Sequence, residues 1–185
     1  MKRLKLNRWF IAVLTLIMAF LVLSPNKIDP LIVEKAAIPD SDYFMEGVVI
    51  HQFNANGELN NRLAANRMEH SSKRDLSLLN NPIITFKNAQ SGEWRLASKS
   101  GRLLNDGSLL KLDEEVNIDE FQADGSSQTN ISTKNLTIDL AANQASTKET
   151  VLIKNQYLKT KSTGLEIDFD QQIIYLKSDV ITHIY

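Results

Sequence analysis

The sequence predicts an all-β body made of repeated strand pairs, preceded by one N-terminal transmembrane helix. Three observations support this prediction: an apolar run after a basic N-terminus, alternation of apolar and polar residues from Tyr43 onward, and a motif that recurs three times. The 185 residues, of which 43% are apolar, suffice for one domain with a core plus an anchor. Because cysteine is absent, a disulfide scaffold, a thiolate metal site and a catalytic thiol are excluded.

Residues 9–25 are predicted to form a signal-anchor helix that remains in the membrane. The run 9–23 contains one polar residue, Thr15, and insertion of such a run into a bilayer is favoured by roughly 3–6 kcal/mol. A cleaved signal peptide is the alternative, since its apolar region looks the same. The run ends at Ser24-Pro25, however, without the small residues that a cleavage site requires. We therefore predict an uncleaved anchor.

Positive charge is concentrated before this run. Four of the 21 basic side chains lie in residues 1–8, so the rest of the chain is weakly acidic. The positive-inside rule then predicts a short cytoplasmic tail over 1–8 and an exported body. Residues 26–42 hold two prolines and mixed charge, and we expect them to tether the anchor to the body. A weakly acidic body lacks the clustered basic charge that nucleic-acid binding requires.

From Tyr43 to the C-terminus the alternation indicates strands rather than helices. Clear alternating segments are 94–99, 110–112, 116–119, 136–140 and 165–169, and turn signals such as Asn105-Asp106-Gly107 separate them. The segment 57–69 has a helix-like composition. Its apolar residues Leu59, Leu63 and Ala65 also fit a two-residue step, so we predict a strand there.

A lysine-containing motif recurs along the body at a nearly constant distance from a later apolar segment. The pairs are Leu96-Ala-Ser-Lys99 with Val116-Asn-Ile118, Ile131-Ser-Thr-Lys134 with Val151-Leu-Ile153, and Leu158-Lys-Thr-Lys161 with Val180-Ile-Thr182. We interpret each unit as a strand with a polar lysine face, a turn, a second strand and a short strand that closes the pair. One such unit cannot bury its apolar face, so the units are expected to stack.

Alternation in a two-layer stack predicts an apolar interior between polar exteriors. The residues predicted to point inward are Val48, Ile50, Leu63, Ile84, Phe86, Trp94, Leu96, Leu110, Leu112, Val116, Ile118, Leu136, Ile138, Ile153 and Ile167. From periodicity alone, an ordinary packed sandwich core is the favoured interpretation of this set.

Residues with catalytic or metal-binding potential are scattered. His51, His70 and His183 lie in separate segments without a carboxylate at ligand spacing, and we interpret them as surface or strand residues. The acidic run Asp113-Glu114-Glu115 is expected at a solvated turn between strands. Esterase and phosphate-loop motifs are absent. We therefore expect no enzyme activity, no metal site and no cofactor.

An ordered series of short fragments runs along the body after the expected anchor. The fragments are 53–59, Arg62-Leu-Ala-Ala65, Asn81-Pro82-Ile-Ile-Thr-Phe86, Trp94-Arg-Leu-Ala-Ser-Lys99, 104–106, Val116-Asn-Ile118 and Ser162-Thr-Gly164-Leu-Glu-Ile167. In their order, and in following an anchor, they resemble the LptC family of bacterial lipopolysaccharide export. Lys154-Asn155-Gln156 departs from the pattern, because family members carry glycine there and differ in loop length.

This resemblance implies a β-jellyroll-like stack that is open along one side. Its interior, lined by the inward residues named above, would receive the acyl chains of lipopolysaccharide. The resemblance also implies an inner-membrane location, with lipid taken from the ABC transporter LptB–LptF–LptG and passed to the periplasmic protein LptA. The alternative is a membrane-anchored periplasmic β-sandwich that binds a partner protein or a glycan through its surface. A packed interior without a lipid-sized groove would favour that alternative.

The final segment 173–185 alternates and has no polar tail after it. An uncovered terminal strand is disfavoured unless something pairs with it, although it could also lie inside the stack and complete it. The resemblance favours pairing with LptA, and it leaves the opposite edge, 43–53, to face the transporter. The residues expected on the LptA side are Ile173, Ile174, Tyr175, Leu176, Val180, Ile181, Ile184 and Tyr185.

Overall fold

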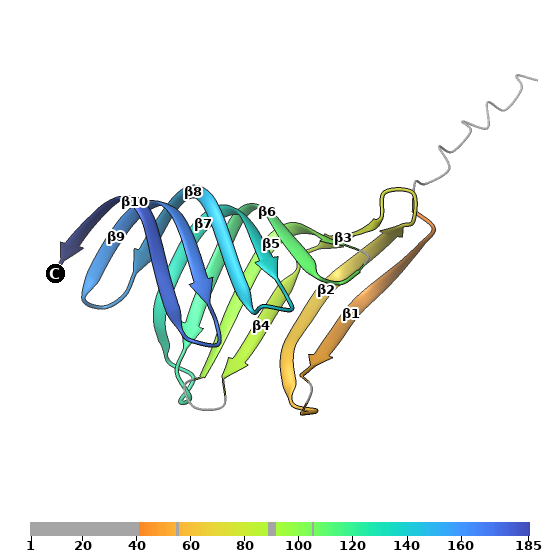
Figure 1. Ribbon diagram of the computed structural model, residues 1–185, viewed down its shortest axis with the longest axis horizontal. Helices are drawn as coiled ribbons and strands as arrows, with labels where there is room; N and C mark the ends of the chain where they lie inside the picture. Colours follow the sequence, from red (N-terminus) through yellow and green to blue (C-terminus); the bar gives the residue numbers. More distant parts are fainter. Residues whose placement is uncertain (1–40, 55, 89–91, 105) are drawn as a thin grey trace, which may run out of the picture. The chain divides into compact units, whose positions relative to one another are not determined.

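The computed structural model describes residues 41–54, 56–88, 92–104 and 106–185 (Figure 1). The expected cytoplasmic tail, the expected anchor helix and all but the end of the expected tether therefore lie outside the described residues. Within the ranges just given, no helix is long and apolar enough to cross a bilayer.

Ten antiparallel strands form the described body. They are β1 (Tyr43–Phe53), β2 (Leu59–Ser71), β3 (Leu76–Asn80), β4 (Ile83–Asn88), β5 (Gly92–Leu104), β6 (Leu109–Phe121), β7 (Ser127–Asp139), β8 (Gln144–Lys154), β9 (Leu158–Asp168) and β10 (Ile173–Ile184). The strand order is β1-β2-β3-β5-β6-β7-β8-β9-β10, and β4 pairs with β2 and β5. The all-β prediction is confirmed, and β2 covers most of the segment whose composition suggested a helix.

Five of the ten strands carry a bulge near the middle. Register shifts fall between Ser98 and Ser100 of β5, Leu112 and Glu115 of β6, Ser132 and Thr137 of β7, Thr147 and Thr150 of β8, and Ser178 and Ile181 of β10. A bulge bends its strand, so a row of neighbouring bulges folds the sheet over. We call this row the crease, and Figure 1 shows the later strands arching along it.

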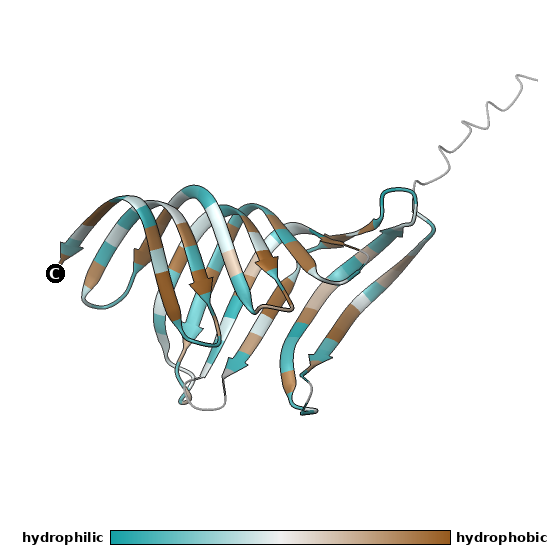
Figure 2. Cartoon of the chain, viewed as in Figure 1, coloured by the Kyte–Doolittle hydropathy of each residue, from teal (hydrophilic) through white to brown (hydrophobic). Residues whose placement is uncertain are grey.

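The crease divides the sheet into two layers. The first layer contains β4 and the strand halves that continue the sheet beside it, which are 48–53, 59–64, 92–98, 115–121, 127–133, 150–154, 158–162 and 180–184. The second layer contains β3 and the remaining half of each long strand. Brown segments alternate with teal ones along the strands of both layers (Figure 2). The core lies between the two layers.

Hydroxyl side chains stabilise the crease. Thr133 Oγ1 donates to the carbonyl of Thr150 at 3.0 Å, and Thr147 Oγ1 donates to the carbonyl of Lys134 at 2.9 Å. Ser98 Oγ donates to the carbonyl of Ser100 at 2.7 Å in the same way. Because a bulge removes backbone groups from the ladder, these hydroxyl groups provide hydrogen bonds to carbonyls at the bulges.

The repeated motif corresponds to hairpins that bend at the crease. Leu96 of β5 lies opposite Ile118 of β6, and Ile131 of β7 lies opposite Ile153 of β8. The expected "second strand" and "closing strand" of each unit are one continuous bent strand, so that part of the interpretation is wrong. The reason is that the bulge interrupts the alternation and makes a single strand look like two.

The core is continuous from β2 to β10. Leu96, Leu112, Ile138 and Ile167 are among the side chains with 0% exposure, and they come from both layers. Burial of each such Leu or Ile stabilises the fold by about 1.5–3 kcal/mol relative to an exposed position.

Candidate functional site

The residues predicted to point inward are almost all buried between the layers. Those with little or no exposure are Leu63, Ile84, Phe86, Trp94, Leu96, Leu110, Leu112, Val116, Ile118, Leu136, Ile138, Ile153 and Ile167. Val48 is half-buried and packs against this cluster, whereas Ile50 is 37% exposed. Both exceptions lie on β1, where the sheet ends.

Several core residues were not on the predicted inward list. Ile131, Val151 and Leu165 are fully buried, and Phe169 is 3% exposed. Ile131 and Val151 both begin segments of the repeated motif, so the repeat contained the signal that could have identified them. Phe169 follows the last residue of β9 and, like Leu165, lies in the alternating segment 165–169 in phase with Ile167, so the alternation also contained the signal for these two residues.

The interior is filled in this structure. Its central side chains, such as Leu110, Ile118 and Leu136, have no exposed surface. Acyl chains could contact these residues only after the two layers had separated.

The N-terminal edge of the sheet exposes apolar side chains on both faces. In the part of the chain that the structure describes, β1 pairs with β2 alone. Met45 lies opposite the buried Met68 and Ile50 opposite the buried Leu63, so both point inward, and both remain partly exposed. Phe44 and Phe53 are more than half exposed. This edge therefore offers both unpaired backbone groups and apolar contacts.

The C-terminal edge has the same character. Among the described strands, β10 pairs with β9 alone, so it completes the stack and leaves one edge unpaired. Ile174 and Leu176 are half-buried against the core. The other residues expected on the LptA side are exposed: Ile173, Tyr175, Val180, Ile181, Ile184 and Tyr185.

Titratable groups lie outside the apolar interior. The acidic run Asp113-Glu114-Glu115 was expected at a turn between strands, and that prediction is wrong. The run lies within β6 and forms its bulge, where Glu114 has a φ of 59°. Asp113 Oδ1 accepts a hydrogen bond from Arg102 Nη2 at 2.5 Å, which raises the pKa of Arg102. Hydrogen bonds from Ser108 and Ser126 lower the pKa of Asp106 and Asp124 in two turns.

The histidines are dispersed among the strands. His51 and His183 are exposed on the two edge strands, and His70 of β2 contacts Ser77 Oγ at 3.2 Å. Within the described stretches, no three His, Asp or Glu side chains come together in a way that could hold a metal ion.

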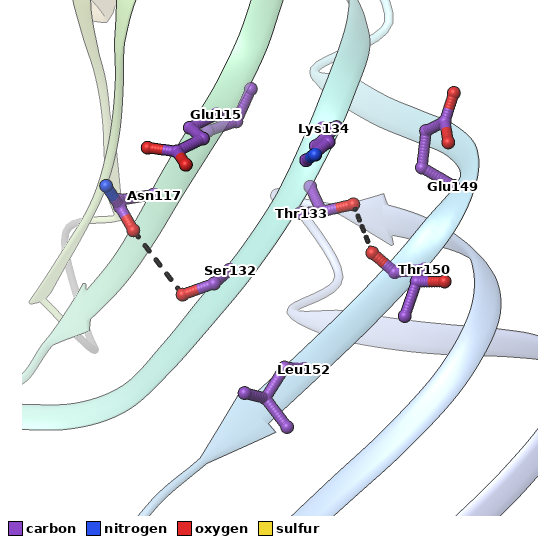
Figure 3. Close-up of a pocket in the computed structure, with 9 residues that line it drawn as sticks. Glu115, Asn117, Ser132, Thr133, Lys134, Glu149, Thr150 and Leu152 are labelled. Carbon is purple, nitrogen blue, oxygen red and sulfur yellow. Dashed lines mark hydrogen bonds between the residues drawn. The ribbon is translucent and has the colours of Figure 1, made fainter.

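A hollow of about 560 Å³ with a mixed polar and apolar lining lies over β6, β7 and β8 near the crease (Figure 3). Glu115, Lys134 and Glu149 give it mixed charge. Ser132 Oγ donates to Asn117 Oδ1 at 3.4 Å across its floor. Val116 and Leu152 are the apolar members of its lining, and its other side chains can form hydrogen bonds to a small polar ligand.

The fold places this body in a class of bent, open-edged β-jellyrolls. It is similar to LptH from Pseudomonas aeruginosa, described as the LptA homologous periplasmic component of a lipopolysaccharide transport device. The TM-score is 0.52 at 11% sequence identity, and the match covers 68% of this chain and 94% of that chain.

The family described as "Lipopolysaccharide-assembly, LptC-related" matches residues 10–185. The chain belongs to the LptC family. A comparison with curated protein sequences found no match. The family and the LptA-like fold support a role in lipopolysaccharide transport, and both are associated with transport proteins rather than enzymes.

Proposed function

We propose that this protein is a single-pass inner-membrane component that receives lipopolysaccharide from the LptB–LptF–LptG transporter and passes it to LptA. Residues 1–8 lie in the cytoplasm, 9–25 span the membrane, 26–42 form the tether and 43–185 form the periplasmic body. One observation carries the proposal: a continuous apolar core connects two unpaired edge strands, and inward apolar side chains are exposed at both edges.

The chemistry of the cargo supports an apolar route. Each methylene group kept from water contributes about 0.8 kcal/mol, so several acyl chains need a shielded path through the periplasm. The inward residues named above supply such a surface when the layers separate. We expect the energy for lifting the lipid to come from the ATP-hydrolysing transporter.

The two edge strands supply the docking sites. An unpaired strand accepts a partner strand through backbone hydrogen bonds, and the exposed apolar side chains beside it add contact area. We propose that β10 pairs with LptA and that β1 faces the transporter. The interior would then continue from one protein into the next.

The filled interior favours a second candidate, in which the body binds a partner protein or a glycan through its outer face. The hollow around Glu115, Lys134 and Glu149 is the place where such a ligand would bind. The first candidate requires lipopolysaccharide to contact the inner face of the sheet, whereas the second requires a partner protein or a glycan to contact the outer face.

Photo-crosslinking in cells distinguishes them. A photoreactive amino acid at Phe86 or Trp94, both buried, should form an adduct with lipopolysaccharide. The same amino acid at Arg95, which points outward and pairs with Glu93 at 2.7 Å, should not. Adducts at Arg95 that equal those at Trp94 would favour the outer-face candidate.

A further inference from the structure

The two layers are joined by side chains on the side away from the crease. Asn60 at the start of β2 belongs to the first layer, and Asn143 in the turn before β8 belongs to the second. Their side-chain amides exchange two hydrogen bonds, Asn60 Nδ2 to Asn143 Oδ1 at 3.0 Å and Asn143 Nδ2 to Asn60 Oδ1 at 2.8 Å. Asn143 Nδ2 also donates to Asp170 Oδ1 at 3.0 Å, which ties the neighbouring turn to the same bridge.

Local backbone features orient both amides. The register of β1 and β2 shifts beside Asn60, because Gln52 lies opposite Asn61 and Phe53 opposite Leu59. A bulge of this kind redirects the side chain of the extra residue. Asn143 has a φ of 50° and is 7% exposed. A buried amide whose nitrogen and oxygen atoms both have hydrogen-bond partners is held in one orientation.

An aromatic cluster joins the layers beside this bridge. Phe86 of β4 stacks on Phe169, which follows β9 in the second layer, with ring centroids 4.2 Å apart and planes at 11°. Trp94 of β5 packs against the same ring at 5.9 Å and 60°. All three side chains are at most 4% exposed, so the cluster seals the end of the core.

The crease and this opposite side differ in how they resist opening. At the crease, the strands run without a break from one layer into the other. On the opposite side, side chains rather than continuous strands join the layers, through the amide bridge and the aromatic cluster. The core residues can reach an acyl chain only after the layers separate, and separation is possible only where no continuous strand joins them.

We propose that the Asn60–Asn143–Asp170 bridge and the Phe86–Phe169–Trp94 cluster form a latch that holds the lipid-binding interior closed until lipopolysaccharide is delivered. This inference rests on the proposed function, because it concerns how lipid reaches that interior. The amide bridge holds the layers together on the side that can open, and the aromatic cluster keeps water from the core while no lipid is bound.

A reversible cross-link tests the latch directly. The chain has no cysteine of its own, so Asn60→Cys with Asn143→Cys creates a single reactive pair. Two amide groups separate the parent β carbons, so a short reducible bis-methanethiosulfonate linker replaces a direct disulfide. A photoreactive amino acid at Leu96 reports lipopolysaccharide in the interior, in the full chain, in membranes with its transporter.

The matched control is Thr137→Cys with Ser146→Cys, treated with the same linker. These residues lie opposite each other on β7 and β8 within the second layer, so linking them leaves the two layers free to separate. Reduction of either linked protein restores the unlinked form, which separates an effect of the linker from an effect of the substitutions.

We expect linking at positions 60 and 143 to lower the Leu96 adduct about tenfold, and reduction to restore it, while the control linker has no effect. An unchanged adduct in the fully linked protein would overturn the latch and leave the proposed function standing. Absence of the adduct from every form, including the unlinked parent, would overturn the proposed function and the latch with it.

Discussion

At the scale of single residues, hydroxyl side chains beside the repeated lysines stabilise the bends of the strands. Ser98 and Thr133 each precede a lysine, and each donates to a carbonyl that the crease removes from the ladder. The lysine marks the outward position of the bulge, and the hydroxyl marks the inward one. In these two copies of the motif, the hydroxyl before the lysine stabilises the bend of the strand; in the third copy, the Thr160 hydroxyl contacts the Thr182 hydroxyl at 3.0 Å instead.

Replacement of Thr133 by valine tests this role. Thr133→Val keeps the side-chain shape but leaves the Thr150 carbonyl without its 3.0 Å hydrogen bond. We expect the free energy of unfolding to fall by about 1–2 kcal/mol. Urea unfolding measures it, and Ser132→Ala on the outer face is the control, with an expected change below about 0.5 kcal/mol. Equal effects of the two changes would contradict the assigned role.

Alternation predicts inward residues well because it depends on local geometry alone. Leu96, Ile118 and Ile138 were predicted to point inward, and each is fully buried. The bulge at Glu114 could not be predicted in the same way, because an interrupted alternation looks like a turn. The bridge between Asn60 and Asn143 joins residues 83 positions apart. It could not be predicted, because alternation along a strand does not indicate which residues of the two layers meet.

At the scale of elements, two Asp-Gly-Ser turns connect long strands. In the turn between β5 and β6, Asp106 Oδ1 accepts hydrogen bonds from the Ser108 amide at 2.9 Å and the Ser108 hydroxyl at 2.8 Å. Asp124 and Ser126 repeat the arrangement between β6 and β7. These bonds favour the ionised carboxylates and lower the pKa of both aspartates below 3.8.

The stability that these hydrogen bonds give to the two turns depends on pH. A lowered folded-state pKa stabilises the turns fully above pH 3.8, the unfolded value, and this stabilisation is lost as the pH falls through the lowered value. A carboxyl-detected NMR titration should therefore place both midpoints below 3.8. Ser126→Ala should move the Asp124 midpoint upward and leave that of Asp106 unchanged. A midpoint at or above 3.8 in the parent protein would contradict the assigned hydrogen bonds.

The two edge strands are proposed to bind different partners. Removal of residues 173–185 deletes β10 and should abolish binding to LptA, because the unpaired edge of β10 is the proposed docking site. Association with the transporter should remain, since β1 is untouched. Co-purification from detergent-solubilised membranes measures both interactions, and circular dichroism checks that the remaining strands are folded. Retained LptA binding with lost transporter binding would reverse the assignment of the two edges.

At the scale of the whole molecule, the expected anchor would hold the β body at the membrane. The mature protein should keep Met1 or Lys2 at its N-terminus and remain with membranes after a high-salt wash, because Ser24-Pro25 provides no cleavage site. N-terminal sequencing and fractionation measure this. Deletion of residues 1–25 should release a folded β body, because none of the repeated units includes those residues. An N-terminus near Asn26 in the parent protein would refute the anchor.

The central claim is that lipopolysaccharide passes through the interior of this body on its way to LptA. Time-resolved photo-crosslinking in proteoliposomes that contain the transporter tests it most directly. The reporters stand at the buried Leu96, at the exposed Asn117 on the outer face, and on LptA. We predict that the Leu96 adduct requires ATP and precedes the adduct on LptA, while Asn117 remains unlabelled. Labelling at Asn117 in place of Leu96, or loading of LptA before Leu96 is labelled, would contradict the claim.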